Sequence, residues 1–194
     1  MKRLEFFFDF GSPTTYLAHT QMPVLAQRTG AEILYRPMLL GGVFKATGNQ
    51  SPAFIPAKSK WMDGDLKTFA KRYGVPYERN PWFPINTMML MRGAVAMERA
   101  GRLVPYADAI FRAIWVEPQN MNDPQVVGGV LAKAGFEPKA MLAEIEKQEI
   151  KDTLRANTDE AVSRGVFGAP TFFIGDKMFF GQDRLEFVEE ALKS

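Results

Sequence analysis

Leu4-Glu-Phe-Phe-Phe-Asp-Phe-Gly-Ser-Pro13 decides the fold, because it joins a short apolar run to a strong helix start. The run over residues 4–9 is aromatic and precedes a Gly-Ser-Pro turn, which predicts a buried strand. Serine followed by proline favours a helix N-terminus, since serine accepts free N–H groups and proline needs no partner there. We expect this helix over residues 13–28 and a second strand over 31–36. The order strand, helix, strand has the size of a βαβ unit.

The C-terminal end of the chain changes from helical to alternating patterns. Residues 171–174 (Thr-Phe-Phe-Ile) and 178–180 (Met-Phe-Phe) are short apolar runs joined by Gly-Asp-Lys, which predicts a β-hairpin. Asp183 followed three residues later by Glu186 has the spacing of a capping box, so a terminal helix is expected to begin there. If all four strands share one sheet, the fold class is α/β, a βαβ…ββα sheet interrupted by an insertion.

The middle of the chain is predicted to be helical after an ordered loop. Residues 40–60 carry three glycines and two prolines, which indicates a loop. Domain organisation follows: residues 1–40 and 165–194 form one discontinuous domain, and 41–164 form a connecting loop plus an all-helical insertion domain. The expected helices begin or end at caps and prolines: Asp65 to Tyr73, Asn86 to Gly101, Pro105 to Trp115, Asp123 to Gly135, Pro138 to about Ile145, and a last one ending near Arg164.

Composition excludes several function classes. The chain of 194 residues has no cysteine, which excludes disulfides, cysteine nucleophiles and thiolate metal sites, and its single histidine excludes a His-rich metal site. A net charge of +2 with no dense basic run gives little support to nucleic-acid binding. No apolar run reaches the roughly 18 residues of a membrane span. Asp9 interrupts the apolar start and no cleavage site follows, so we expect no signal peptide, a cytoplasmic location and no metal.

Ser12 has two interpretations that share one geometry. It can be an ordinary helix N-cap, which stabilises a helix by ~1 kcal/mol. Alternatively, the free N–H groups and positive end of the helix dipole can stabilise a bound thiolate, with the hydroxyl donating to its sulfur. Serine needs a base to act as a nucleophile, and His19 lies about two turns along the helix. The functional interpretation is therefore that Ser12 orients and activates an external thiol.

Two further segments can complete a site beside Ser12. Ala169-Pro170 precedes a strand; it is either an ordinary strand-initial proline or a cis turn that frees the backbone of Ala169 for a peptide-like ligand. Gln182, Asp183 and Arg184 either begin the last helix or bind an α-amino-acid end group. Trp61, Trp82 and Phe83 are core residues or line an apolar pocket, and the lysines at 45 and 58 are solvated or pair with a ligand carboxylate.

Four motifs in order resemble one family over the whole chain. They are Phe-Asp-Phe-Gly-Ser-Pro-Thr-Thr-Tyr at 8–16, Lys-Ala-Thr-Gly-Asn at 45–49, Arg-Gly-Val-Phe-Gly-Ala-Pro-Thr-Phe-Phe at 164–173, and Phe-Gly-Gln-Asp-Arg-Leu at 180–185. Together they resemble the 2-hydroxychromene-2-carboxylate isomerases, bacterial relatives of the kappa-class glutathione transferases. The resemblance implies a thioredoxin-like fold with a helical insertion, a homodimer and glutathione as cofactor.

The resemblance also implies roles for individual residues. Ser12 matches the serine at the glutathione sulfur, and Lys45 is a candidate for the substrate side. The remaining matched positions lie at the glutathione site: Asn49, Ala169 with its backbone, Pro170 as a cis-proline, Gln182 and Asp183 at the γ-glutamyl end, and Arg184 beside them.

The implied reaction is reversible addition of the glutathione thiolate to a conjugated substrate, rotation and elimination. It interconverts 2-hydroxychromene-2-carboxylate and trans-o-hydroxybenzylidenepyruvate in aromatic, naphthalene-type degradation. Two alternatives remain open at this point: a kappa-like glutathione transferase that conjugates electrophiles, and a non-catalytic glutathione-binding protein of thioredoxin fold.

Overall fold

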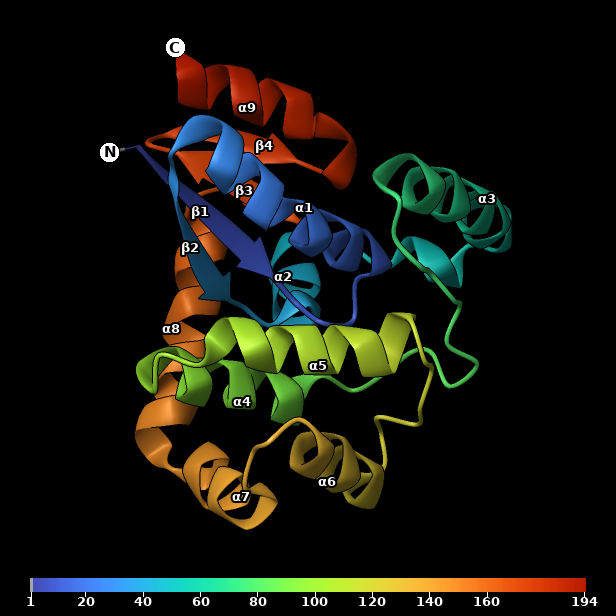
Figure 1. The fold of residues 1–194 in the computed structure, drawn as a ribbon, viewed down its shortest axis with the longest axis vertical. Coiled ribbons are helices and arrows are strands. Elements are labelled where there is room, and N and C mark those ends of the chain that lie inside the picture. Colours follow the sequence, from blue (N-terminus) through green and yellow to red (C-terminus); the bar gives the residue numbers. More distant parts are fainter. Residues whose placement is uncertain (1) are drawn as a thin grey trace.

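The computed structural model describes residues 2–194, and its centre is a mixed four-stranded sheet in the order β2-β1-β3-β4 (Figure 1). β1 (Arg3–Phe8) pairs in parallel with β2 (Glu32–Pro37) and antiparallel with β3 (Thr171–Ile174), which pairs antiparallel with β4 (Lys177–Phe180). The predicted βαβ…ββα order is confirmed, and the four strands do share one sheet.

Both faces of β1 are buried, because successive side chains point to opposite sides of a strand. Phe6 and Phe8 lie in the larger core with Phe172, whereas Phe7 lies in a second core with Phe173 and Ala161. The larger core is shared with α1 (Pro13–Thr29), α9 (Leu185–Lys193) and the helical block; the second is closed by α2 (Leu40–Thr47) and α8 (Gln148–Ser163). The continuous aromatic run of the sequence reflects this burial on two sides.

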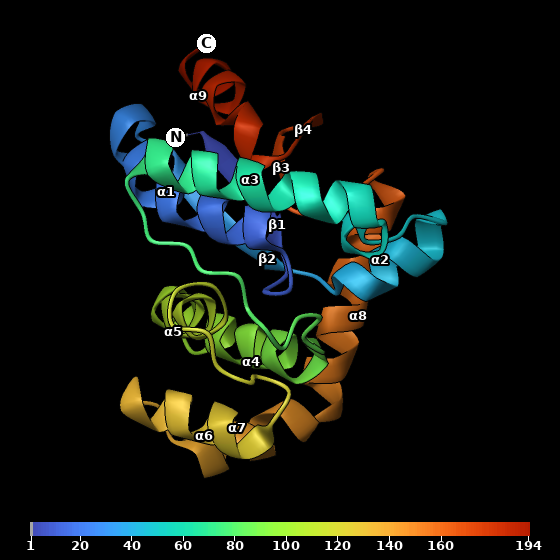
Figure 2. The ribbon, with the colours of Figure 1, turned by 90° about the vertical axis from the view of Figure 1, so that its right-hand side faces the viewer.

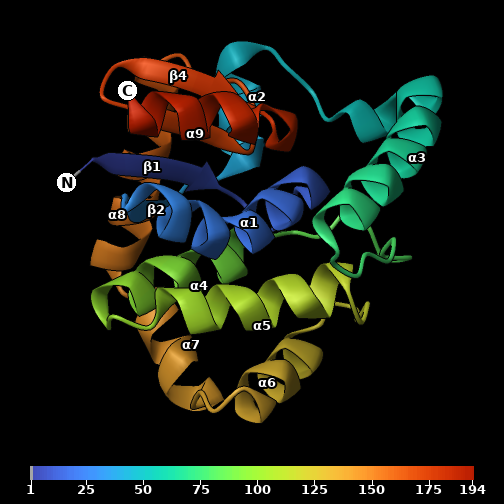
Figure 3. The same cartoon turned by 45° about the horizontal axis from the view of Figure 1, so that its top comes forward.

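The helices α4 to α7 form a block beside the sheet (Figures 2 and 3). The helix α3 runs along α1, and we call α2, η1 and α3 together the arm. α3 packs beside α1 and η1, while α4 packs against α5, α7 and α8. None of the helices within residues 2–194 combines the length and apolarity needed to cross a bilayer. The bounds are η1 (Pro52–Phe54), α3 (Pro56–Tyr73), α4 (Met88–Arg99), α5 (Leu103–Trp115), α6 (Pro124–Lys133) and α7 (Pro138–Glu146).

The predicted loop over residues 40–60 is wrong, since α2, η1 and the start of α3 occupy most of it. Tertiary contacts override the two weak helix formers at 41 and 42. The backbone N–H of Leu40 donates to the Asp9 carboxylate at 2.8 Å, and a Cβ at Gly42 would lie 3.1 Å from the Thr158 methyl group of α8. Glycine therefore permits the close packing of α2 on α8.

The predicted capping box at Asp183 is also wrong. Residues 182–184 form a 3₁₀ turn, η2, and α9 begins at Leu185 without any side-chain cap. The Asp183 carboxylate instead accepts a hydrogen bond from Arg184 at 2.7 Å, and Glu186 pairs with Arg72 of α3. Three helix starts shift as well: α3 begins at Pro56 rather than at Asp65, α4 begins after Thr87 rather than at Asn86, and α5 begins two residues before Pro105.

Candidate functional site

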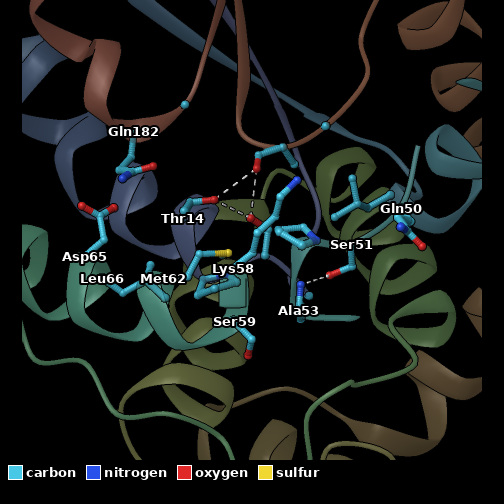
Figure 4. Close-up of a pocket in the computed structure, with 18 of the residues that line it drawn as sticks. Thr14, Gln50, Ser51, Ala53, Lys58, Ser59, Met62, Asp65, Leu66 and Gln182 are labelled. Atoms are coloured by element: carbon cyan, nitrogen blue, oxygen red, sulfur yellow. Dashed lines mark hydrogen bonds between the residues drawn. The ribbon is translucent and has the colours of Figure 1, made fainter. Parts of the chain in front are cut away.

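A cavity of about 1060 Å³ lies where the start of α1, the loop before β3, the turn after β4 and the arm formed by α2, η1 and α3 meet (Figure 4). It brings together Ser12, Asn49, Ala169, Gln182 and Asp183 from the predicted set. Lys45, Pro170 and Arg184 are not among the lining residues; Lys45 is exposed on α2, while Lys58 lines the cavity.

Ser12 caps α1 as predicted and is 5% exposed. Its Oγ accepts a hydrogen bond from the backbone N–H of Thr15 at 3.2 Å. The same oxygen lies 2.8 Å from Thr14 Oγ1, and both hydroxyls lie 3.1 Å from the carbonyl oxygen of Ala169, as the dashed lines in Figure 4 show. The serine therefore sits at the positive end of a helix with its hydroxyl facing a second hydroxyl and a carbonyl.

The Ala169–Pro170 peptide bond is cis. The expectation that both backbone groups of Ala169 are free is wrong for its carbonyl, because two hydroxyls of α1 donate to it. The carbonyl of Pro170 accepts a hydrogen bond from Gly181 N at 3.0 Å, which holds the turn after β4 against the loop before β3. The start of α1 and these two loops thus form one wall.

Two carboxylates lie at one end of the cavity. Asp65 of α3 and Asp183 of η2 both line it, and burial together with the nearby Asp183 charge raises the pKa of the Asp65 carboxyl. Figure 4 shows Asp65 facing Gln182. The backbone carbonyl of Gln182 accepts a hydrogen bond from the Tyr73 hydroxyl at 2.7 Å. Two neighbouring carboxylates favour a cation between them. Asp65 was not predicted as a site residue, because its sequence context is that of an ordinary amphipathic helix.

The cavity is also lined by an amide and an ammonium group, those of Asn49 and Lys58. Asn49 Nδ2 donates to the carbonyl of Phe167 at 2.9 Å, which joins the loop after α2 to the loop before β3. Lys58 extends into the middle of the view in Figure 4 and forms no ion pair with residues 2–194. The cavity therefore separates a carboxylate end from an unneutralised cation.

An aromatic wall adjoins the Ser12 loop. Trp115 is 2% exposed and its indole N–H donates to the carbonyl of Phe10 at 2.9 Å. Its ring centroid lies 5.7 Å from that of Phe83 and 6.3 Å from that of Tyr77. Among the predicted aromatic residues, Phe83 and Trp61 line the cavity and Trp82 does not. Trp115 was missed because its periodicity is that of a core helix residue.

Arg79 stands beside this wall. Its guanidinium lies 3.3 Å from Ser59 Oγ and forms no ion pair with residues 2–194. The backbone N–H of Glu78, the preceding residue, donates to the carbonyl of Trp115 at 2.8 Å, which fixes this segment against the wall. A guanidinium without an ion pair that lines the same cavity as these three aromatic rings suits a planar anion.

His19 lies outside the cavity. Its Nε2 is 2.7 Å from an Asp108 oxygen, its Nδ1 is 2.9 Å from the Tyr35 hydroxyl, and the residue is 6% exposed. Both ring nitrogens are occupied, so no imidazole base reaches Ser12. Within residues 2–194, histidine, aspartate and glutamate side chains form no group of three that could hold a metal ion.

Asp9 holds the loop that carries Ser12 through hydrogen bonds of its buried carboxylate. Its carboxylate is 1% exposed and accepts hydrogen bonds from Gly11 N and Leu40 N, both at 2.8 Å. Burial raises the pKa of this carboxyl, while these two N–H groups and the Thr87 hydroxyl oppose the shift. One buried side chain therefore holds both the turn before α1 and the first turn of α2.

We expect Asp9→Asn to change the pH dependence of stability. Because the folded-state pKa of Asp9 lies above 3.8, its ordinary value, folded protein binds this proton more tightly than unfolded protein. Wild-type stability therefore falls as pH rises from about 4 through the folded-state pKa, and the variant lacks this component. Urea unfolding at a series of pH values should show that Asp9→Asn has a lower free energy of unfolding than the wild type. This difference should be largest at acid pH and become smaller as the pH rises. A deficit that is constant with pH would contradict the assignment.

Comparison with known proteins supports one family. The profile described as DSBA-like thioredoxin domain matches residues 3–193. A 2-hydroxychromene-2-carboxylate isomerase from Sphingobium xenophagum is 32% identical over 98% of this chain and 98% of its own. Glutathione S-transferase kappa 1 from Caenorhabditis elegans is 29% identical over 100% of this chain and 92% of its own. A solved structure of 2-hydroxychromene-2-carboxylate isomerase superposes with a TM-score of 0.88 at 30% identity, covering 98% of this chain and 94% of that one.

Proposed function

Because this chain belongs to the 2-hydroxychromene-2-carboxylate isomerase family of DSBA-like thioredoxin domains, we propose that it is a glutathione-dependent isomerase. The reaction is the interconversion of 2-hydroxychromene-2-carboxylate and trans-o-hydroxybenzylidenepyruvate, or of a closely related aromatic acid. The single observation that carries the proposal is a buried serine hydroxyl at the N-terminus of α1 in a chain without cysteine. Such a site stabilises a thiolate that must come from outside the chain.

The residues around the cavity fit glutathione. The carboxylates of Asp65 and Asp183 suit the ammonium of the γ-glutamyl group. A bound ammonium would lower the pKa of Asp65, which burial and the Asp183 charge raise. The loop at Ala169 lies beside Ser12, where the cysteinyl part would place its sulfur. Lys58, which forms no ion pair within residues 2–194, offers the glycyl carboxylate a cation, and Asn49 also lines the cavity.

When bound, glutathione supplies a thiolate that adds to a conjugated double bond and leaves again after rotation. The chain supplies position and charge stabilisation. The N-terminus of α1 lowers the thiol pKa by up to roughly 1.5 units, because a helix dipole stabilises an anion by up to ~2 kcal/mol. The Ser12 hydroxyl adds a charge-assisted hydrogen bond to sulfur. The aromatic wall holds the acceptor ring beside that sulfur.

Arg79 is the proposed partner of the substrate carboxylate. Its guanidinium forms no ion pair within residues 2–194 and lines the cavity with Tyr77, whose hydroxyl feels its charge, so it can pair with an acid group while the ring stacks. Lys45, predicted for this role, lies on the exposed side of α2.

Arg79→Gln is expected to raise KM for the aromatic acid about three- to tenfold and to leave kcat within about twofold, because the lost contact is equal in ground and transition states. Steady-state kinetics at saturating glutathione measures both constants. Arg155→Gln, on the exposed face of α8, is the matched control and should change neither. A fall in kcat with unchanged KM would contradict the binding role of Arg79.

Calorimetry with glutathione tests the cofactor, and spectrophotometric turnover with substoichiometric glutathione tests the reaction. An isomerase completes many turnovers without consuming glutathione, whereas a kappa-like transferase consumes one molecule in each turnover. The second candidate is favoured by the kappa-class relatives. Binding without turnover of either kind would leave a non-catalytic glutathione-binding protein and overturn both. Failure to bind glutathione would overturn all three.

The cytoplasmic location, homodimeric assembly and place in aromatic degradation belong to the same proposal. The division of the chain into a discontinuous domain, residues 1–40 and 165–194, and an insertion, residues 41–164, is also part of the proposal. Light scattering coupled to gel filtration measures the assembly directly, and a monomer at micromolar concentration would contradict the proposed homodimer.

A further inference from the structure

Three oxygen atoms at the start of α1 share only two protons. Ser12 Oγ and Thr14 Oγ1 are 2.8 Å apart, and each lies 3.1 Å from the carbonyl oxygen of Ala169. Each hydroxyl carries one proton, and the carbonyl carries none. Either hydroxyl can therefore satisfy the carbonyl while the other donates its proton elsewhere.

Ser12 alone could not serve both the carbonyl and a bound sulfur. Ala169 is 8% exposed, so a carbonyl that loses its donor pays a desolvation penalty. With a single hydroxyl at this place, turning the Ser12 proton toward sulfur would leave the carbonyl unpaired. That penalty would oppose formation of the thiolate.

We propose that Thr14 is a positioning residue that frees the Ser12 proton for the glutathione sulfur. The inference rests on the proposed function and names a second hydroxyl in the same site. When the thiolate is present, Thr14 keeps donating to the Ala169 carbonyl and Ser12 donates to sulfur. No proton leaves either side chain, and the thiol proton passes to solvent. Thr14 touches the carbonyl and Ser12 rather than the reacting atoms.

Thr15 provides an internal contrast at the next position. Its hydroxyl is fully buried and forms no hydrogen bond with the described residues 2–194, although its backbone N–H donates to Ser12 Oγ. Replacement of Thr15 by valine therefore removes a hydroxyl without such a bond, whereas the same replacement at Thr14 removes one that is hydrogen-bonded to Ser12 and Ala169.

The test measures the thiol pKa of bound glutathione from thiolate absorbance against pH in wild type, Thr14→Val, Thr14→Ala, Thr14→Ser and Thr15→Val. We expect Thr14→Val and Thr14→Ala to raise this pKa by about half to one unit, which matches one lost hydrogen bond. At pH values below the wild-type thiol pKa this is a roughly three- to tenfold loss of thiolate. Thr14→Ser should restore the wild-type value, and Thr15→Val should leave it unchanged.

Calorimetry with S-methylglutathione separates this role from a shape effect, because that ligand forms no thiolate. Its affinity should be the same in wild type and Thr14→Val. An unchanged thiol pKa in both Thr14→Val and Thr14→Ala would overturn the inference while the proposed function stands. An equal loss of affinity for glutathione and its S-methyl form, not restored by serine, would also overturn it. A wild type that does not bind glutathione would overturn the proposed function itself.

Discussion

Ser12→Ala should reduce the isomerisation rate by about ten- to a hundredfold at pH values below the wild-type thiol pKa of bound glutathione, while glutathione still binds. The reason is the lost hydrogen bond from Ser12 to sulfur: bonds to a charged group contribute about 1.5–3 kcal/mol, which corresponds to one to two units of thiol pKa. At pH values below the wild-type thiol pKa, the thiolate fraction falls by the same factor. Raising the pH should recover much of the rate, because deprotonation then no longer depends on the serine. Rate measurements against pH, with thiolate absorbance in parallel, report both quantities.

Ser51→Ala is the matched control for this variant. Ser51 also lines the cavity and also caps a helical turn, since its Oγ accepts the backbone N–H of Ala53 at 3.3 Å. Its hydroxyl lies on the arm rather than at the start of α1, so the thiol pKa should not move. Both variants lose a cap of about 1 kcal/mol, and thermal unfolding confirms that they remain folded. An equal rate loss in both would reduce Ser12 to a structural cap.

Gly93→Ala should lower the free energy of unfolding by about 3 kcal/mol, because overpacking and an unpaired buried group act together. Gly93 lies in α4 where it crosses α5. A Cβ there would lie 2.7 Å from Tyr106 Cζ and still closer to the Tyr106 hydroxyl. That tyrosine is 1% exposed and its hydroxyl donates to the carbonyl of Leu90 at 2.9 Å, so its ring cannot move without breaking the bond. Urea unfolding monitored by circular dichroism measures the loss.

Gly64→Ala is the control, with the opposite sign expected. Gly64 is an exposed residue inside α3, and a Cβ there meets nothing within 4 Å. Alanine should stabilise the protein by about 0.5–1 kcal/mol, since glycine loses more backbone entropy in a helix. Tyr106→Phe in the Gly93→Ala background should recover part of the loss by removing the nearest atom. Two glycine variants of equal stability would contradict the packing argument.

Local chemistry made much of the fold predictable. The aromatic strand β1, the Ser-Pro start of α1 and the Asp-Pro start of α6 each follow from a cap or a turn in adjacent residues. α2 could not be predicted in this way, because its glycines need the Asp9 carboxylate and the close surface of α8 to be helical. Propensity describes a segment alone, and this segment is stabilised by residues far along the chain.

The residues of the candidate site also differ in whether their neighbours in the sequence reveal them. Ser12 and Asp183 carry signals in neighbouring residues or in a resemblance, so the sequence pointed to them. Asp65, Arg79 and Trp115 look like ordinary residues of a helix or a loop, and they meet only because α3 and α5 both reach the start of α1. Thr14 gains its role from a carbonyl at the other end of the chain, which no local pattern can reveal.

The pairing of β1 with β3 has a consequence for synthesis. β1 is synthesised more than 160 residues before β3, the strand that pairs with it, and its phenylalanines belong to two cores on opposite sides. A nascent chain therefore carries an open strand edge and exposed aromatic side chains until β3 has left the ribosome. The helical block, whose contacts are largely between near neighbours in the chain, can fold earlier. The candidate site is lined by residues 11–14 and by residues 167–169 and 180–183, so it is completed only after both segments have left the ribosome.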